Sequence, residues 1–193
     1  MASDLTIEQL QTAMPRLKRV LSDAEKYIDP LNAAMAEYLI NTPNRQAAFL
    51  AQIAHESGEL VYWREIWGPT PQQRKYEPPS ELAMRLGNTV AGDGSRYRGR
   101  GPIQITGRAN YLRFGVKLDL DLINEPELLE EPEHGFRAAA CYWKERGLNE
   151  LADKNTLEAF RQITKRINGG YNGLDDRLKY WELAKTALNI GAG

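Results

Sequence analysis

The pattern of hydrophobic and polar positions along the chain is mainly that of helices. Apolar residues at spacing i, i+3, i+4, i+7 mark a helix with one buried face. This spacing occurs twice: at Ala47, Leu50, Ala51 and Ala54, and at Phe136, Ala139, Ala140 and Trp143. Two further helices are indicated by apolar residues three or four positions apart, one by Leu157, Phe160, Ile163 and Ile167 and a last one by Leu174, Leu178, Trp181 and Leu188. Strands and helices do not alternate along the chain, so a parallel sheet is not expected.

Capping signals predict where these helices begin and end. A Thr or Asp followed by Pro is typical of an N-cap and the first helical residue. Thr42-Pro43 therefore predicts a helix start with Gly58 at its end, and Asp29-Pro30 predicts a second helix that runs to about Ile40. Further helices are expected at residues 5–14, briefly at 79–86, from 106 or 107 to 114, and from 155 or 156 to 168.

Residues 58–102 differ from the rest because Gly and Pro recur throughout them. Such punctuation predicts turns, and the two tryptophans and three tyrosines between Val61 and Tyr97 argue against disorder. We expect one mostly α domain with a loop-rich insertion or a small β-hairpin at its centre.

Composition excludes several classes of protein. The chain of 193 residues has 25 Lys and Arg against 26 Asp and Glu, a net charge of -1, which argues against nucleic-acid binding and stable membrane association. The single cysteine, Cys141, cannot form an intrachain disulfide. With two histidines no metal is expected: His55 would be structural and His134 a surface residue before the helix of Phe136. The start of the chain does not resemble a signal peptide, so we expect synthesis in a cytoplasm.

Glu56 is the first candidate for chemistry. It lies three and seven residues after Ile53 and Phe49, at the edge of the apolar face and in the last turn of the predicted helix. Both features disfavour an ionised carboxylate, and a carboxyl that keeps its proton suits a general acid. From spacing alone, a solvated or Arg-paired Glu is the more common outcome.

Glu65 is the second candidate, nine residues later in the aromatic run YWREIW. Sugar rings stack on Trp and Tyr, and their hydroxyls need polar partners, so a carboxylate among aromatics suits a sugar site. The alternative is a loop Glu neutralised by Arg64, and the pattern does not separate the two.

The segment from Tyr97 to Thr106 is the most distinctive. Gly99, Gly101 and Pro102 permit close backbone approach, and in an extended chain Gln104 and Thr106 would face one side while the intervening isoleucines face the core. A hairpin strand with one polar face is the alternative. The segment lacks the spacing and Lys of a phosphate loop, and His55-Glu56 lacks the second His of a zinc protease.

Together these motifs resemble family 19 glycoside hydrolases, which include plant-type chitinases and the endolysins of bacteriophages. The resemblance covers residues 43–185 and is carried by HESG at 55–58, by YRGRGPIQITGRANY at 97–111, and by INGG at 167–170 followed by Arg177. The chain departs from the plant pattern in lacking disulfides and in WGPTPQQRKYEPP at 67–79, which places it nearer the phage branch.

The resemblance implies a lysozyme-like α+β fold in which two helical lobes flank a cleft. Residues 1–193 would form one catalytic domain, with N-terminal helices over 1–40 and the family 19-like core over 43–189.

The resemblance also implies an inverting mechanism without a cofactor. Glu56 matches the general acid, Glu65 the general base and Thr106 a hydroxyl that helps hold the attacking water. Glu77 and Glu81 remain alternatives for the base because of the departure at 67–79. Further residues match positions that bind substrate or support the carboxylates: Tyr97, Gln104, Asn110, Tyr111, Asn168 and Arg177.

Three functions are compatible with these residues. The first is cleavage of β-1,4 bonds in peptidoglycan by a monomer that reaches the cell wall through a membrane pore, as endolysins do. The second is a chitinase acting on N-acetylglucosamine polymers. The third, a non-catalytic glycan-binding homologue, is disfavoured by the presence of both Glu56 and Glu65. The choice between muramidase and glucosaminidase specificity stays open.

Overall fold

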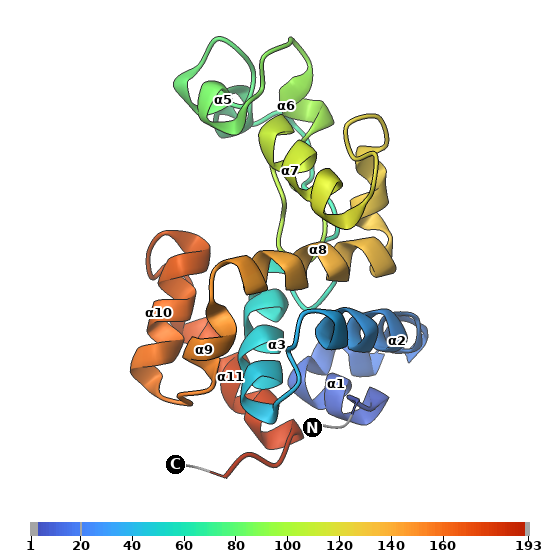
Figure 1. Cartoon of the computed structure of the whole chain (residues 1–193), viewed down its shortest axis with the longest axis vertical. Helices are drawn as coiled ribbons and strands as arrows, with labels where there is room; N and C mark the ends of the chain where they lie inside the picture. Colours follow the sequence, from blue (N-terminus) through green and yellow to red (C-terminus); the bar gives the residue numbers. More distant parts are fainter. Residues whose placement is uncertain (1–3, 20, 192–193) are drawn as a thin grey trace.

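The computed structural model of the chain describes residues 4–19 and 21–191 (Figure 1). The elements are α1 (Ile7–Ala13), the 3-10 helix η1 (Pro15–Arg19), α2 (Leu21–Glu37), α3 (Pro43–Ser57), α4 (Pro71–Arg74), α5 (Glu81–Leu86), α6 (Asp93–Arg96), α7 (Arg108–Leu118), the 3-10 helix η2 (Pro126–Glu130), α8 (Pro132–Glu145), α9 (Leu148–Ala152), α10 (Leu157–Asn168) and α11 (Leu174–Ala187). The mostly α prediction is confirmed. Within the described residues the expected hairpin is reduced to isolated bridges from Arg100 to Arg64 and Ile105.

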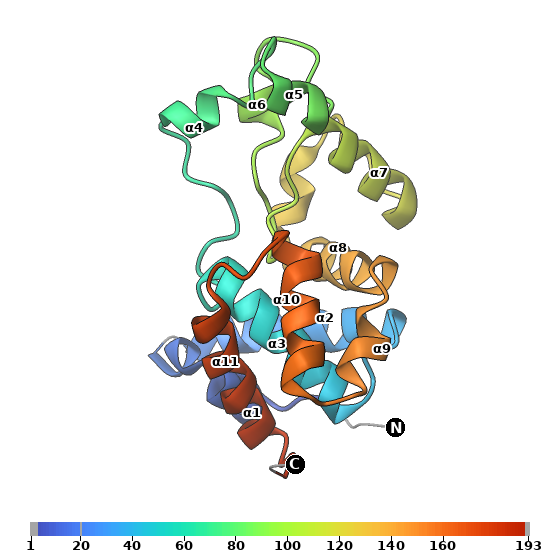
Figure 2. The same ribbon diagram turned by 90° about the vertical axis from the view of Figure 1, so that its left-hand side faces the viewer.

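The helices form two lobes (Figures 1 and 2). We call α1–α3 with α9–α11 the larger lobe, and α4–α7 with η2 the smaller lobe. Each has its own apolar core, and α8 lies between them and contributes to both. Phe136, Ala139, Ala140 and Trp143 of α8 face the core of the larger lobe, whereas Ala138 and Cys141 face that of the smaller lobe.

The central helix of the larger lobe, α3, forms where the capping signals predict. The Thr42 hydroxyl accepts a hydrogen bond from the N–H of Arg45 (3.3 Å), Pro43 stands in the first turn, and Gly58 ends the helix at a φ of 59°. Glycine adopts this left-handed conformation without the cost of a Cβ. The helix is buried along most of its length and packs against α11, so its C-terminal Glu56 is held rigidly.

The predicted helix start at Asp29-Pro30 is wrong. Pro30 lies inside α2, which begins at Leu21. Ala24, Tyr27, Ile28 and Leu31 form a continuous buried stripe across this point, and burial of that stripe outweighs the hydrogen bond that Pro30 cannot donate.

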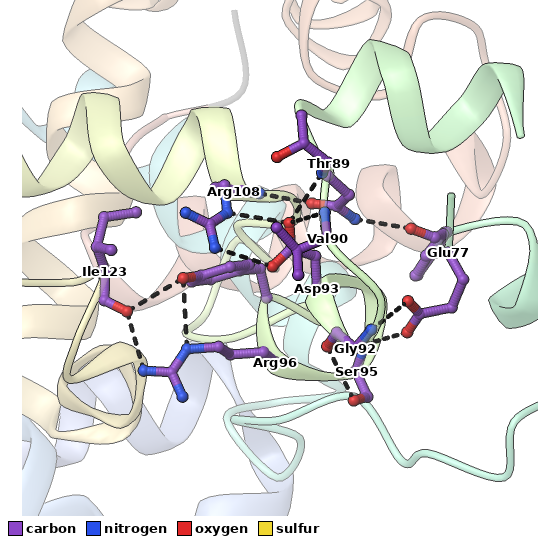
Figure 3. A network of polar contacts seen from close by, with 12 residues as sticks. Glu77, Thr89, Val90, Gly92, Asp93, Ser95, Arg96, Arg108 and Ile123 are labelled. Carbon is purple, nitrogen blue, oxygen red and sulfur yellow. Dashed lines mark hydrogen bonds and ion pairs between the residues drawn. The ribbon is translucent and has the colours of Figure 1, made fainter. Parts of the chain in front are cut away.

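The expected loop-rich segment is ordered by short helices and by polar contacts (Figure 3). The two carboxylate oxygens of Glu77 accept N–H bonds from Gly92 (2.8 Å) and Ser95 (3.1 Å) at the start of α6. Asp93 forms a two-pronged ion pair with Arg108 of α7, at 3.0 and 3.1 Å. Burial is the largest single influence on the pKa of Asp93 and acts to raise it. The hydrogen bonds from Arg108 and from the N–H groups of Val90 and Thr89 together outweigh burial, so the pKa lies below its usual value.

None of the helices within residues 4–19 and 21–191 is long and apolar enough to cross a lipid bilayer.

We expect Gly135→Ala to destabilise the fold at the junction of the lobes. A Cβ on Gly135 would lie 2.6 Å from the Trp63 ring and 2.8 Å from the Leu129 carbonyl oxygen. Overpacking of this kind costs about 1–3 kcal/mol, which for a chain of this length lowers Tm by roughly 3–10 °C. Thermal unfolding followed by circular dichroism measures the change. The control is Gly170→Ala, because a Cβ on Gly170 meets open space; equal Tm values for the two variants would contradict the prediction.

Candidate active site

Glu56 is anchored by a buried arginine from the far end of the sequence. Nη2 of Arg177, in α11, donates to Oε1 of Glu56 at 2.5 Å, and Nη1 donates to Oε1 of Gln52 at 2.5 Å. Gln52 in turn donates to the hydroxyl of Thr164 in α10 at 3.1 Å. The residue Arg177 is only 2% exposed. Its guanidinium therefore contacts the carboxylate from the protein interior and is not accessible to a substrate.

The second oxygen of Glu56 is left for chemistry. Among the described residues Oε2 of Glu56 accepts no hydrogen bond, and its side chain is 23% exposed. The sequence predicts apolar surroundings for Glu56, but in the structure the buried guanidinium of Arg177 contacts its Oε1. The pKa of Tyr142 is also raised, mainly by burial. Arg146 acts to lower this pKa, and the negative charge of Glu56 acts to raise it.

His55 and the α10–α11 loop close the same end of α3. Nδ1 of His55 lies 2.7 Å from Oδ2 of Asp176, as a structural histidine requires. Gly173 approaches so closely that a Cβ there would lie 2.3 Å from the His55 ring. Asn168 Nδ2 donates to the carbonyl oxygen of Asn172 at 3.1 Å across the loop, which Figure 2 shows beside the end of α3. This loop therefore borders Glu56.

His134 is not the surface residue expected before its helix. It lies in the first turn of α8, its side chain is 18% exposed, and its Nδ1 is buried without a hydrogen bond. The helix starts earlier than expected because Pro132 occupies its first turn. Among residues 4–19 and 21–191 no three His, Cys, Asp or Glu side chains are grouped as metal ligands would be.

Glu65 is held by neutral donors. The N–H of Gly99 donates to Oε2 of Glu65 at 3.1 Å, and Nε2 of Gln73 donates to Oε1 at 2.9 Å. The N–H of Glu65 donates back to the carbonyl oxygen of Gly99 at 2.8 Å. Gln73 is not among the site residues that the sequence motifs predict. Thr70-Pro71-Gln72-Gln73 is a capping box, a signal that indicates a short helix whose Gln folds back on its start.

The other two carboxylates proposed for the base lie elsewhere. Glu77 binds the N–H groups that begin α6, and Glu81 is exposed in the first turn of α5. Glu65 is therefore the one of these three whose carboxylate contacts the 97–106 segment.

The side chains of Gln104 and Thr106 both lie against Gly99, the residue whose N–H binds Glu65. A Cβ on Gly99 would lie 2.6 Å from Oε1 of Gln104 and 3.3 Å from the Thr106 hydroxyl, so both side chains pack against the Gly99 backbone. Thr106 donates to the carbonyl oxygen of Gln104 (3.0 Å), and Asn110 donates to that of Thr106 (2.8 Å). All three side chains are partly exposed. The expected extended alternation is wrong, because residues 101–104 form a turn in which Gln104 has a φ of 54°. Ile105 is buried, but Ile103 is only half-buried.

Two residues expected to bind substrate are core residues. Tyr97 and Tyr111 are 1% and 0% exposed. The Tyr97 hydroxyl donates to the carbonyl oxygen of Ile123, and that of Tyr111 to the carbonyl oxygen of Arg98. Burial raises the pKa of Tyr111, an effect opposed by the neighbouring Arg100. These two aromatic rings support the segment from inside the smaller lobe and have no surface to offer a glycan.

The sequence of the chain is similar to those of known proteins. The family model described as chitinase class I, of glycosyl hydrolase family 19, matches residues 36–157. A glycosyl hydrolase family 19 domain-containing protein of Haemophilus influenzae is 40% identical over 161 residues, covering 71% of this chain and 76% of that protein. Endochitinase 2 of Gossypium hirsutum is 35% identical over 102 residues, 50% of this chain but 34% of the endochitinase.

The fold has solved counterparts. The crystal structure of chitinase C from Streptomyces griseus HUT6037 superposes with a TM-score of 0.74 at 19% identity, covering 100% of this chain and 96% of that one. Because the family model spans most of the chain and the Haemophilus relative matches it well, the chain belongs to glycoside hydrolase family 19.

Proposed function

We propose that the protein hydrolyses β-1,4 bonds of N-acetylglucosamine polymers with inversion at the anomeric carbon. The observation that supports this best is the pair of carboxylates in unlike settings, Glu56 against a buried guanidinium and Glu65 against an amide and a backbone N–H. An inverting hydrolase needs two carboxyls with different tasks, separated by about 6.5–9.5 Å to admit a water.

Each group has one task in this scheme. The free Oε2 of Glu56 carries the proton to the leaving glycosidic oxygen, and Arg177 stabilises the carboxylate that results. Glu65 takes a proton from a water that attacks the opposite face of the sugar. The hydroxyl of Thr106 donates to a backbone carbonyl, so its lone pairs can accept the other proton of that water.

Chitin is the substrate that the named relatives favour, because several of them are described as endochitinases. Peptidoglycan shares the β-1,4-linked N-acetylglucosamine unit but carries carboxylates on its lactyl groups and peptides. Cleavage of peptidoglycan, and with it action at a cell wall after passage through a membrane pore by a monomeric protein, is our second candidate.

Two unpaired arginines favour this second candidate. Arg98 and Arg146 are partly buried, and neither guanidinium forms a hydrogen bond or ion pair with any described residue. Arg98 precedes Gly99, whose N–H binds Glu65, and its guanidinium lies 5.9 Å from the centre of the Trp67 ring. The guanidinium of Arg146 lies 3.4 Å from the centre of the Tyr142 ring, whose pKa is also raised by the charge of Glu56. Both are cations without an acidic partner among the described residues, so an acidic glycan could bind them.

We expect Glu56→Gln to lower kcat by 100- to 10,000-fold, the range typical of general acid–base catalysis, because an amide cannot donate the proton. Glu65→Gln should lower kcat less, since another group or bulk water can partly replace the base. Hydrolysis of N-acetylglucosamine hexamer and of purified peptidoglycan measures both, with Glu81→Gln as the exposed control. Near-wild-type activity of folded Glu56→Gln, or a product that retains the anomeric configuration by NMR, would refute the scheme.

The choice of substrate has its own test. If the second candidate is right, Arg98→Met and Arg146→Met each lower activity on peptidoglycan roughly 10-fold, the loss expected for one hydrogen bond to a charged group, and leave activity on the neutral hexamer unchanged. Arg85→Met is the control, because Arg85 is exposed in α5. Peptide-free glycan strands show whether lactyl or peptide carboxylates matter. Equal losses on hexamer and peptidoglycan would leave chitin as the substrate.

A further inference from the structure

We infer that Gln73 is the positioning residue of the general base, holding the carboxylate of Glu65 in one orientation beside the attacking water. The inference rests on the proposed function. Its starting point is the 2.9 Å contact from Nε2 of Gln73 to Oε1 of Glu65, made by a residue that is only 5% exposed.

The carboxamide of Gln73 uses its full hydrogen-bonding capacity. Nε2 donates to Glu65 and to the carbonyl oxygen of Ile66 (2.7 Å), while Oε1 accepts from the N–H groups of Thr70 (2.8 Å) and Gly68 (3.1 Å). An amide offers two donors and two acceptor lone pairs, and all four are engaged. Such a group has one orientation available to it.

Reversal of this amide is forbidden by its neighbours. A rotation by 180° would bring Oε1 of Gln73 against the carboxylate of Glu65 and turn its NH2 group toward the two N–H groups of Gly68 and Thr70. Both ends would then face groups of like polarity and lose their hydrogen bonds in a buried place, which is costly. The donor end is therefore fixed toward Glu65.

Gln73 is itself fixed by the turn that contains it. Its N–H donates to the hydroxyl of Thr70 at 3.2 Å, and Pro71 restricts the first turn of α4. The chain thus leaves Glu65, turns at Gly68 and returns an amide to the same carboxylate eight residues later. With Gly99 on Oε2, each oxygen of Glu65 has one fixed donor and a remaining lone pair.

A neutral donor suits a base better than a cation does. Arg177 places positive charge on Glu56, which must become a carboxylate during the reaction. Glu65 must instead accept a proton, and an amide orients it without a positive charge that would oppose protonation. Gln73 therefore controls the rate of the chemical step and not the binding of the glycan.

The test removes the donor to Glu65. Gln73→Glu keeps an oxygen for the N–H groups of Gly68 and Thr70 but replaces the NH2 group with a second carboxyl oxygen, which also adds a negative charge beside Glu65. With N-acetylglucosamine hexamer, or peptidoglycan if the wild type cleaves it faster, we expect kcat to fall roughly 10- to 100-fold and KM to change less than twofold. Gln73→Met, isosteric and without donors, should do the same. Ser80→Ala removes the N-cap of α5 in the same lobe and should leave kcat unchanged.

A double-mutant cycle separates positioning from mere support of the fold. If Gln73 acts through the base, Gln73→Glu has no further effect on kcat in the Glu65→Gln background, whereas a structural role would lower kcat again. Loss of kcat in Glu65→Gln without loss in either Gln73 variant would overturn this inference and leave the proposed function standing. Unchanged kcat in Glu65→Gln would instead remove Glu65 as the base.

Discussion

The two-sided burial of α8 is the constraint on which the rest of the structure depends. A helix buried on both faces needs small side chains where neighbours approach closely, and α8 supplies Gly135 and Ala138–Ala140. Both lobes pack on this one helix. The segment that carries Glu65 passes over its start, where the Trp63 ring lies against Gly135. The position of Glu65 relative to Glu56 therefore depends on how the two lobes pack on α8.

A second constraint acts at Glu56, the proposed acid, and it is the burial of a charge. A buried guanidinium is tolerated only when it is paired and hydrogen-bonded. Arg177 is paired with Glu56 and Gln52, although its Nε remains without a partner. The same contacts that make Arg177 acceptable in the interior also fix Oε1 of Glu56. Stability and the proposed catalysis thus share one ion pair at this end of α3.

Local signals in the sequence predict the long helices well and the site only in part. Thr42, Gly58 and Thr156 act as the caps that their residue types indicate, and Glu65 emerges beside the segment expected to contact it. Pro30 misleads because tertiary burial outweighs a local signal. Helices α4, α6 and α9 are too short for periodicity to reveal. Tyr97 and Tyr111 match the family motif, yet only packing shows that they face inward.

The two carboxylates also differ in how far along the chain their partners lie. Gln73 follows Glu65 by eight residues, whereas Arg177 follows Glu56 by 121. On a ribosome the amide contact to Glu65 can form as soon as α4 has emerged. Glu56 stays without its cation until α11 is synthesised and docks on α3. In the proposed scheme a chain that lacks α11 therefore lacks a complete acid, and hydrolytic activity requires α11 to be in place.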